Sequence, residues 1–204
     1  MSNDTPYATG ARENAVEHAI GLLLDAIQPD WRSNPDFAAT PKRVAKMYVH
    51  ELCFGVFGDP PTITAFEKPP TMDEMIVVGP LVVHSVCPHH LAPIIGNAWI
   101  GVLPRTRLLG LSKYARIVRW CVARPAMQET VTEMIADCLE RALGLHNQPP
   151  PGVAVLVRAE HLCMKWRGVR EPAAITTTSA LRGAFRDNAA TRSEFLRLVQ
   201  EKRA

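Results

Sequence analysis

Two short motifs, far apart in the chain, constrain its fold more than any other feature. One reads Cys87-Pro88-His89-His90, and the other is a His-x-Cys motif that ends at Cys163. Thiol and imidazole donors in this number are what zinc prefers in proteins. If Cys87, His90 and Cys163 hold one metal ion, the fold must bring these two distant segments together.

The number of donors distinguishes two kinds of metal site. Three protein ligands leave a coordination position open for water, as in catalytic zinc sites, whereas structural sites are closed by four. His89 and His161 would remain beside the metal. Adjacent side chains of an extended segment point to opposite faces, so His89 and His90 could both bind only if Pro88 bends the chain. One histidine on the metal and one facing a substrate is simpler. His161 and Cys163, two apart on an expected strand, would share a face.

Apolar periodicity predicts a helical N-terminal part and a separate main body. An amphipathic helix is expected over residues 12–27, and Thr40-Pro41 is expected to cap and open a second helix. Residues 54–70 carry Gly and Pro clusters that are typical of a loop. We therefore expect an N-terminal helical segment with its linker over residues 1–70 and a catalytic domain over residues 71–204.

The main body has the pattern of an α+β fold. Short apolar runs predict an antiparallel sheet, two helical stretches after residue 110 predict a helix pair, and a Thr191 to Glu194 capping box predicts a last helix. The expected strands are residues 75–78, 81–86, 94–103, 153–157, 160–166 and 174–179, and the last helix is expected over residues 187–204.

Composition limits the compartment and the partners. With 204 residues, 47% of them apolar, the chain can bury a full core without disulfides. Its five cysteines are odd in number, and no signal peptide or long apolar run is present, so we expect a reducing cytoplasm and no membrane. Cys121 and Cys138 fall on apolar helix faces, where core packing is the better interpretation. A net charge of +3 is too small to indicate nucleic acid.

The placement of the positive charges is more informative than their sum. Basic residues recur near the motifs, which suits an anionic small ligand at least as well as a polymer, although a solvated helix face is the plain alternative. Arg43, in the first turn of the second expected helix, opposes the helix dipole and is a candidate for binding an anion. The basic residues near the motifs are Lys113, Arg116, Arg119, Lys165, Arg167, Arg170 and Arg182.

Two helix starts carry side chains that suit a purine nucleotide. Ser112 can cap a helix whose first turns present Lys113 and Arg116 on one face, which would make a phosphate cradle. Gln128 and Glu129 stand in the first turn of the next helix. A carboxylate there is favourable for the dipole alone, but an amide and a carboxylate together can also bind a purine edge.

Five motifs, in this order and at similar spacing, resemble the GTP cyclohydrolase I family. The resemblance runs from Thr40-Pro41 almost to the C-terminus. The motifs are Cys87-Pro88-His89-His90, Gly110-Leu111-Ser112-Lys113, Arg124-Pro125-x-x-Gln128-Glu129, His161-x-Cys163-Met164-x-x-Arg167-Gly168 and Thr176-Thr177-Thr178-Ser179.

The resemblance implies a tunnelling fold, in which antiparallel sheets with a helix pair on one face join between subunits into a barrel. Members form a homodecamer of two stacked five-subunit rings, with active sites between subunits. They are zinc-dependent hydrolases that open the imidazole ring of GTP, release formate and rearrange the ribose to give 7,8-dihydroneopterin triphosphate. This product can lead to tetrahydrofolate, to another pterin or to a deazapurine, and the sequence does not distinguish these pathways.

The resemblance also implies roles for individual residues. It makes Cys87, His90 and Cys163 the zinc ligands, and His89 and His161 the proton-transfer residues, with Ser112 as a relay. Ribose and triphosphate would be held by Ser112, Lys113, Arg116 and Arg167, joined by Arg43 of a neighbouring subunit, and guanine by Gln128 and Glu129. Family members usually have glutamate where this chain has Pro88, so that carboxylate and a backbone N–H are missing here.

Two other functions compete with this interpretation. One is a tunnelling-fold relative that acts on another purine or pterin triphosphate. The other is a non-catalytic, zinc-stabilised module that binds nucleic acid, which would need a fourth protein ligand and interleaved basic and aromatic residues.

Overall fold

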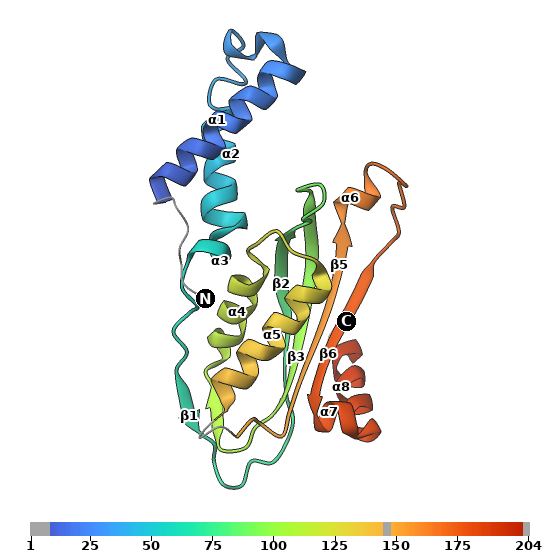
Figure 1. Ribbon diagram of the computed structural model, residues 1–204. Coiled ribbons are helices and arrows are strands. Elements are labelled where there is room, and N and C mark those ends of the chain that lie inside the picture. The colour runs from blue at the N-terminus through green and yellow to red at the C-terminus, as the bar shows by residue number, and fades with distance from the viewer. Residues whose placement is uncertain (1–8, 145–147, 202–204) are drawn as a thin grey trace. The chain divides into compact units, whose positions relative to one another are not determined.

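The chain divides between Asp59 and Pro60 into two units, which are described separately (Figure 1). A computed structural model describes residues 9–144 and 148–201. Within those ranges, no helix combines the length and the apolar character needed to span a membrane.

The first unit is helical, as the sequence predicts. Its elements are α1 (Thr9–Ile27), the 3₁₀ turn η1 (Pro29–Arg32), α2 (Thr40–Lys46), the π-helical turn η2 (Met47–Leu52) and α3 (Phe54–Phe57). Asp25 of α1 accepts hydrogen bonds from Trp31 and Arg32, which ties η1 to α1. The expected Thr40 cap is wrong by one residue, because Ala39 is the N-cap and makes no side-chain capping bond.

The second unit is built on an antiparallel sheet of four strands. The strands are β2 (Ile76–Val86), β3 (Pro93–Leu103), β5 (Gly152–His161) and β6 (Thr176–Gly183), in the order β2-β3-β5-β6. A short ladder joins β1 (Ala65–Glu67) to β4 (Arg107–Leu109). The central pair is β3 and β5, and this order places the start of β3 between the ends of β2 and β5.

One strand replaces the two that the sequence predicts around Gly79-Pro80. β2 runs through this dipeptide, and its register with β3 shifts between Val78 and Leu81. A proline cannot donate to a ladder, and it is tolerated here because β2 is an edge strand with an irregularity at that point.

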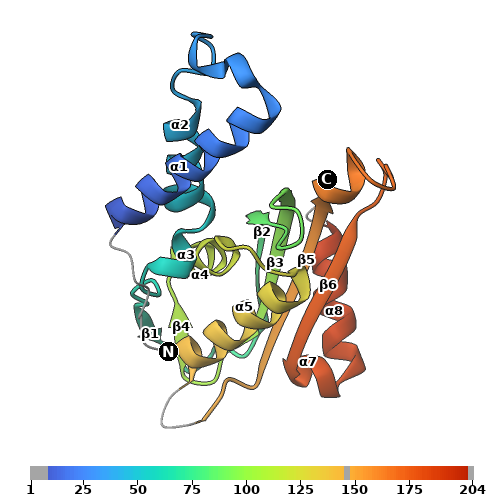
Figure 2. The same ribbon diagram turned by 45° about the horizontal axis from the view of Figure 1, so that its top comes forward.

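Helices cover both faces of the sheet (Figure 2). On one face lie α4 (Leu111–Val122) and α5 (Gln128–Leu143), whose Ile117 and Ile135 pack in the cluster that includes Ile100 of β3. On the other lie α7 (Ala184–Asp187) and α8 (Ala189–Glu201), where Phe195 packs with Trp99. Consecutive residues of β3 therefore face opposite cores. The predicted helix pair is confirmed, and the C-terminal helix adds a second layer.

The aromatic side chains of the second layer approach β3 very closely. Phe185 and Phe195 pack edge to face, with ring centroids 5.6 Å apart. A Cβ added at Gly101 would lie 2.7 Å from the ring of Phe195. Glycine at this position allows α8 to reach the sheet.

Two expectations about the last third of the chain are wrong. The strand expected over residues 160–166 ends at His161, and α6 (Leu162–Lys165) follows it. The expected capping box at Thr191 is replaced by Asn188, whose Oδ1 accepts from the backbone N–H of Ala190 at 2.8 Å and of Thr191 at 3.2 Å.

Candidate metal centre and active site

The two distant motifs meet at one end of the sheet. The sulfur atoms of Cys87 and Cys163 and a ring nitrogen of His90 all lie within 4.8 Å of one another. Donor atoms around a tetrahedral zinc are roughly 3.5–4 Å apart, because the bonds are about 2.0–2.3 Å long. Small side-chain rotations would bring the three donors onto one ion.

Strand pairing explains why the motifs meet. Ile94, near the start of β3, pairs with Ser85 of β2 on one side and with His161 of β5 on the other. Cys87 directly follows β2, and Cys163 lies in α6 directly after β5 (Figure 1). Both cysteines are therefore delivered to the same end of the sheet.

A tight turn holds the first motif in place. The N–H of Cys87 donates to the carbonyl of Ala92 at 2.8 Å, and the N–H of Leu91 donates to the carbonyl of Cys87 at 2.9 Å. Leu91 has φ +52°, a left-handed conformation that is costly for a branched side chain. The turn bends the chain at Pro88, so His89 is not directed away from Cys87: its Nδ1 lies 3.9 Å from the Cys87 sulfur.

The cluster has a buried side and a solvent side. Cys87 is 3% exposed and packs with Ile94, Ala159 and the half-buried Cys163, whereas His90 is exposed. Two thiols and one imidazole form a donor set that suits zinc, and the exposed side leaves room for a further ligand.

The second histidine of the site is oriented by Gln128. His161, the last residue of β5, places Nε2 2.8 Å from Oε1 of Gln128. The Gln128 amide nitrogen donates to the carbonyls of Val157 and Thr176, both at 3.2 Å, and to Thr178 Oγ1 at 3.0 Å. Because the amide oxygen is an acceptor, Nε2 of His161 must donate, which leaves Nδ1 unprotonated in the neutral ring.

Burial favours the neutral form of His161. The half-buried position lowers the pKa of His161, and the nearby Glu129 carboxylate partly opposes this shift. Gln128 is only 3% exposed, so the residue expected to contact guanine is committed to the protein's own network, and Glu129 next to it is exposed. The sequence alone did not reveal this link, since Thr176 and Thr178 carried no assigned role.

The loop between α4 and α5 is fastened to the same end of the sheet. Ser85 donates its hydroxyl to the carbonyl of Arg124 at 3.1 Å, and the N–H of Ala126 donates to the carbonyl of Val86 at 3.1 Å. These bonds place the start of α5, with Gln128 and Glu129, beside the metal cluster.

Three residues that were expected to hold phosphate lie near the start of α4, at the end of this helix that is away from the metal cluster. The twelve residues of α4 span about 18 Å at 1.5 Å per residue, and its last turn is the one near Val86. Ser112, Lys113 and Arg116 lie in its first turns, so a single chain does not bring them to the metal cluster. Gly110, and not Ser112, is the N-cap. The Lys113 ammonium donates to the carbonyl of Thr62 at 3.3 Å.

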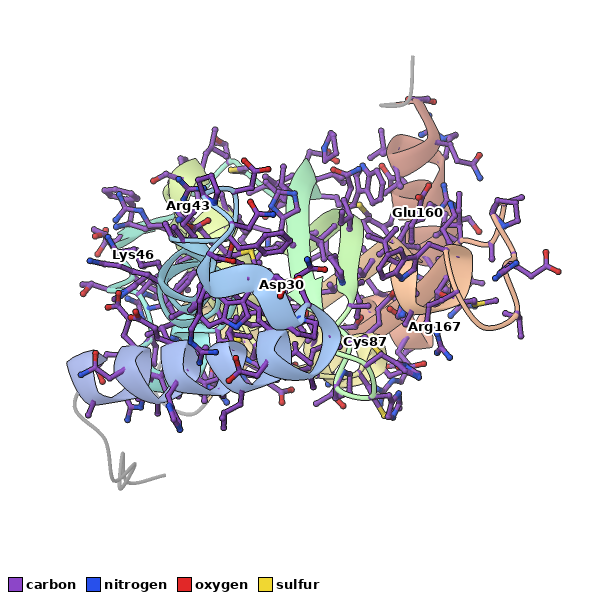
Figure 3. All side chains as sticks on the ribbon, turned by 90° about the horizontal axis from the view of Figure 1, so that it is seen from above. Asp30, Arg43, Lys46, Cys87, Glu160 and Arg167 are labelled. Carbon is purple, nitrogen blue, oxygen red and sulfur yellow. The ribbon has the colours of Figure 1, made fainter. Side chains whose placement is uncertain are left out.

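The other basic residues near the motifs differ in whether they are exposed or paired with a carboxylate of the same chain. Burial and the neighbouring Cys87 raise the pKa of Cys163, and the exposed Arg167 is close enough to oppose this shift in part. Figure 3 looks down on this end of the sheet, with Cys87, Glu160 and Arg167 labelled. Lys165 pairs with Glu160 at 2.8 Å. Arg43 is exposed on α2 and belongs to the first unit.

Arg182 joins β6 to α5 and is not free to bind a ligand. Its guanidinium pairs with Glu133, with Asp137 at 3.2 Å and with Glu140 at 3.7 Å. The hydrogen bond with Glu133 is the main reason that the pKa of Arg182 is raised. This cation has a structural role.

An α+β body with two thiols, one imidazole and further histidines gathered at one end of an antiparallel sheet is typical of an enzyme with a site that could hold a metal ion. The family model for GTP cyclohydrolase I matches residues 16–200, and the chain belongs to this family, with its tunnelling fold.

Similar proteins support this membership. The chain is 44% identical over 194 residues to GTP cyclohydrolase 1 of Mycobacterium avium (strain 104), an alignment that covers 92% of this chain and 89% of the relative. It is 40% identical over 192 residues to GTP cyclohydrolase 1 of Pelotomaculum thermopropionicum, covering 92% and 97%. It is 42% identical over 197 residues to GTP cyclohydrolase 1 of Mycobacterium tuberculosis (strain ATCC 25618 / H37Rv), covering 93% and 92%.

Proposed function

We propose that this chain catalyses the hydrolytic opening of the imidazole ring of GTP, the release of formate and the rearrangement of the ribose to 7,8-dihydroneopterin triphosphate. The observation that carries the proposal is the convergence of Cys87, His90 and Cys163 beside His161, in a chain of the GTP cyclohydrolase I family.

Zinc is the resident metal that we propose, held by Cys87, His90 and Cys163. When bound, zinc would supply a Lewis acid and a site that activates water near neutral pH. The buried Cys87 sulfur, the half-buried Cys163 sulfur and the exposed imidazole fit an ion that is reached from the solvent side.

The histidines move protons in this proposal. His161 keeps its own proton on Nε2, toward Gln128, so Nδ1 is the nitrogen that accepts and returns a proton during ring opening. His89, next to Cys87 in the turn, supplies the second imidazole.

In this proposal, one group binds the guanine edge of the nucleotide and another binds its phosphates. The exposed Glu129 carboxylate can accept from two N–H groups of guanine. Gln128 assists by fixing His161 and the start of α5. Arg167, a permanently charged fork near Cys163, is the phosphate anchor that belongs to the same chain as the metal ligands.

A second copy of the chain completes the site. Lys113, Arg116 and the hydroxyl of Ser112 stand about one helix length from the metal cluster, so a neighbouring subunit must supply these groups, together with Arg43. Within the described residues, β2 and β6 are open edges of the sheet, and joining such edges between copies gives a closed assembly, for which we propose the decamer. The free thiols of the chain suit a reducing cytoplasm, and we place the product on the route to tetrahydrofolate.

The test is to incubate the zinc-loaded full chain with GTP and to measure formate and pterin fluorescence together. We expect the zinc-loaded chain to give both products in equal amounts. The chain should give neither product once a chelator has removed the metal, and it should give both again when zinc is restored. GTP consumption without formate would reject the proposal, and turnover of another purine triphosphate in place of GTP would favour the alternative substrate.

A further inference from the structure

A pair of thiols outside the metal site joins α4 to α5. The thiol of Cys121 donates to the sulfur of Cys138 across 3.8 Å. The guanidinium of Arg141, one turn further along α5, donates to the same Cys138 sulfur at 3.2 Å. One sulfur thus receives two donors, one of which carries a full positive charge.

The two cysteines differ in access. Cys121 is fully buried, whereas Cys138 is half-buried and lines a pocket of about 240 Å³. The pocket lies entirely within the second unit, and its other walls are mainly apolar: Pro60, Pro61, Ile63, Ile117 and Trp120, with Arg141 as the charged group. A small molecule in this pocket can reach Cys138, whereas the fully buried Cys121 is not among the residues that line it.

The surroundings make Cys138 the reactive member of the pair. The hydrogen bond from Cys121 and the charge of Arg141 lower the pKa of Cys138 to about 6, although burial and Asp137 oppose this. The same contact, together with burial, raises the pKa of Cys121. A thiolate beside a cation in a partly open position is the usual setting of an oxidant-sensitive cysteine.

Core packing alone does not explain this arrangement. Cys53 of the first unit is an ordinary packed cysteine, and burial raises the pKa of its thiol. Cys138 differs because a guanidinium and a second thiol both point at its sulfur.

We propose that Cys138 and Cys121 are a peroxide-sensitive thiol pair, in which Cys138 is oxidised first and Cys121 then closes a disulfide between α5 and α4. The oxidant is a small hydroperoxide that enters the pocket. This thiol chemistry is separate from the metal site, since neither cysteine belongs to the Cys87, His90 and Cys163 cluster.

The chemistry balances in two steps. The Cys138 thiolate attacks the peroxide, the O–O bond breaks, and a sulfenic acid forms while the other oxygen takes up a proton and leaves as water or an alcohol. The Cys121 sulfur then attacks the Cys138 sulfur, the S–S bond forms, the S–O bond breaks, and the hydroxyl leaves as water with the Cys121 proton. The two sulfurs are oxidised and the peroxide is reduced.

The test uses the zinc-loaded full chain, treated with hydrogen peroxide, quenched and digested with trypsin. Cleavage after Arg119 and Arg141, with no cleavage between Arg124 and Pro125, gives one peptide that contains both cysteines. We expect this peptide to lose two hydrogen atoms in mass and to regain them with a reductant. Oxidation of Cys53 at the same rate, or no mass loss in this peptide, would overturn the proposal.

Three variants test the order of the steps. Cys121→Ser should leave Cys138 trapped as a sulfenic acid that dimedone labels, and Cys138→Ser should leave Cys121 unoxidised. Arg141→Gln should slow oxidation of Cys138 by about tenfold, because it removes the cation that favours the thiolate. The matched control, Cys53→Ser, should change nothing. A Cys138→Ser chain whose Cys121 still oxidises at the wild-type rate would contradict the assigned order.

Discussion

Gln128 shows how a single buried amide can organise a reactive imidazole. Its nitrogen has three acceptors in the protein, and its oxygen accepts from His161. In the proposed reaction, Gln128 would act on the substrate through His161. The Gln128 side chain fixes the His161 proton on Nε2, so Nδ1 is the ring nitrogen that can accept a second proton.

We predict that Gln128→Leu lowers kcat by about ten- to a hundredfold and leaves KM for GTP nearly unchanged, because His161 loses the partner that orients it. Steady-state kinetics of formate release distinguish a role of Gln128 in orienting His161 from a role in binding guanine. If KM rose with kcat unchanged, Gln128 would be a guanine-binding residue, as the family resemblance suggests. Thermal unfolding of the same variant shows whether it is folded.

We predict that His89→Ala keeps bound zinc and loses most activity. His89 lies beside Cys87 but is not among the three clustered donors, so its loss should not release the metal. Metal analysis and formate release are the two measurements. His18→Ala, an exposed histidine of α1, is the matched control and should behave like the wild type. Near-normal turnover of His89→Ala would remove this residue from proton transfer.

At the scale of elements, long apolar patterns were predictable and short ones were not. The helices α4 and α5 and the strand β3 follow their periodicity, because each buries an apolar face in the core. The helix α1 also forms where its periodicity predicts it, although Leu24 is its one buried side chain among the described residues. The residues His161 to Trp166 alternate like a strand, but β3 begins at Pro93, which has no N–H to pair, and β5 has no ladder partner beyond His161. The local sequence does not contain that information.

The same reasoning explains the error at the C-terminal helix. Thr191 and Glu194 have the spacing of a capping box, yet Asn188 comes earlier and caps the helix with two hydrogen bonds. Both patterns are valid locally. Asn188 directly precedes Ala189, where α8 begins, whereas Thr191 lies within the helix.

We predict that Phe195→Ala lowers the free energy of unfolding by about 3–5 kcal/mol, because it empties a fully buried site between α8 and β3. Urea unfolding measures the change. The neighbouring Leu196 is 39% exposed, so Leu196→Ala should cost less than about 1 kcal/mol. Equal losses in the two variants would show that α8 does not pack on the sheet through Phe195.

At the scale of the whole molecule, the sequence predicted the metal cluster, which one chain forms, but it did not predict how the phosphate-binding residues reach that cluster. The convergence of Cys87 with Cys163 follows from strand order, and the two half-motifs indicated it. The expected phosphate cradle of Lys113 and Arg116 does not join the cluster in one chain, because α4 carries it to the opposite end. Residue patterns cannot reveal which groups a neighbouring copy supplies.

We predict that two inactive variants restore activity when they are mixed. Lys113→Ala damages the proposed phosphate half of each site and Cys163→Ala the metal half, so each alone should release little formate. When the two are denatured and reassembled in equal amounts, about a quarter of the sites between chains should receive two intact halves. Reassembly of each variant with itself is the control, and no gain on mixing would contradict a site shared between subunits.

The most direct test of the account measures zinc per chain and formate released from GTP in the same preparations of the wild type and of Cys163→Ala. Cys53→Ala, a buried cysteine of the other unit, is the matched control. We predict about one zinc per chain and full turnover in the wild type and the control, and loss of both in Cys163→Ala, because two donors hold zinc too weakly. A Cys163→Ala chain that kept one zinc per chain and released formate at the wild-type rate would contradict the three-ligand centre.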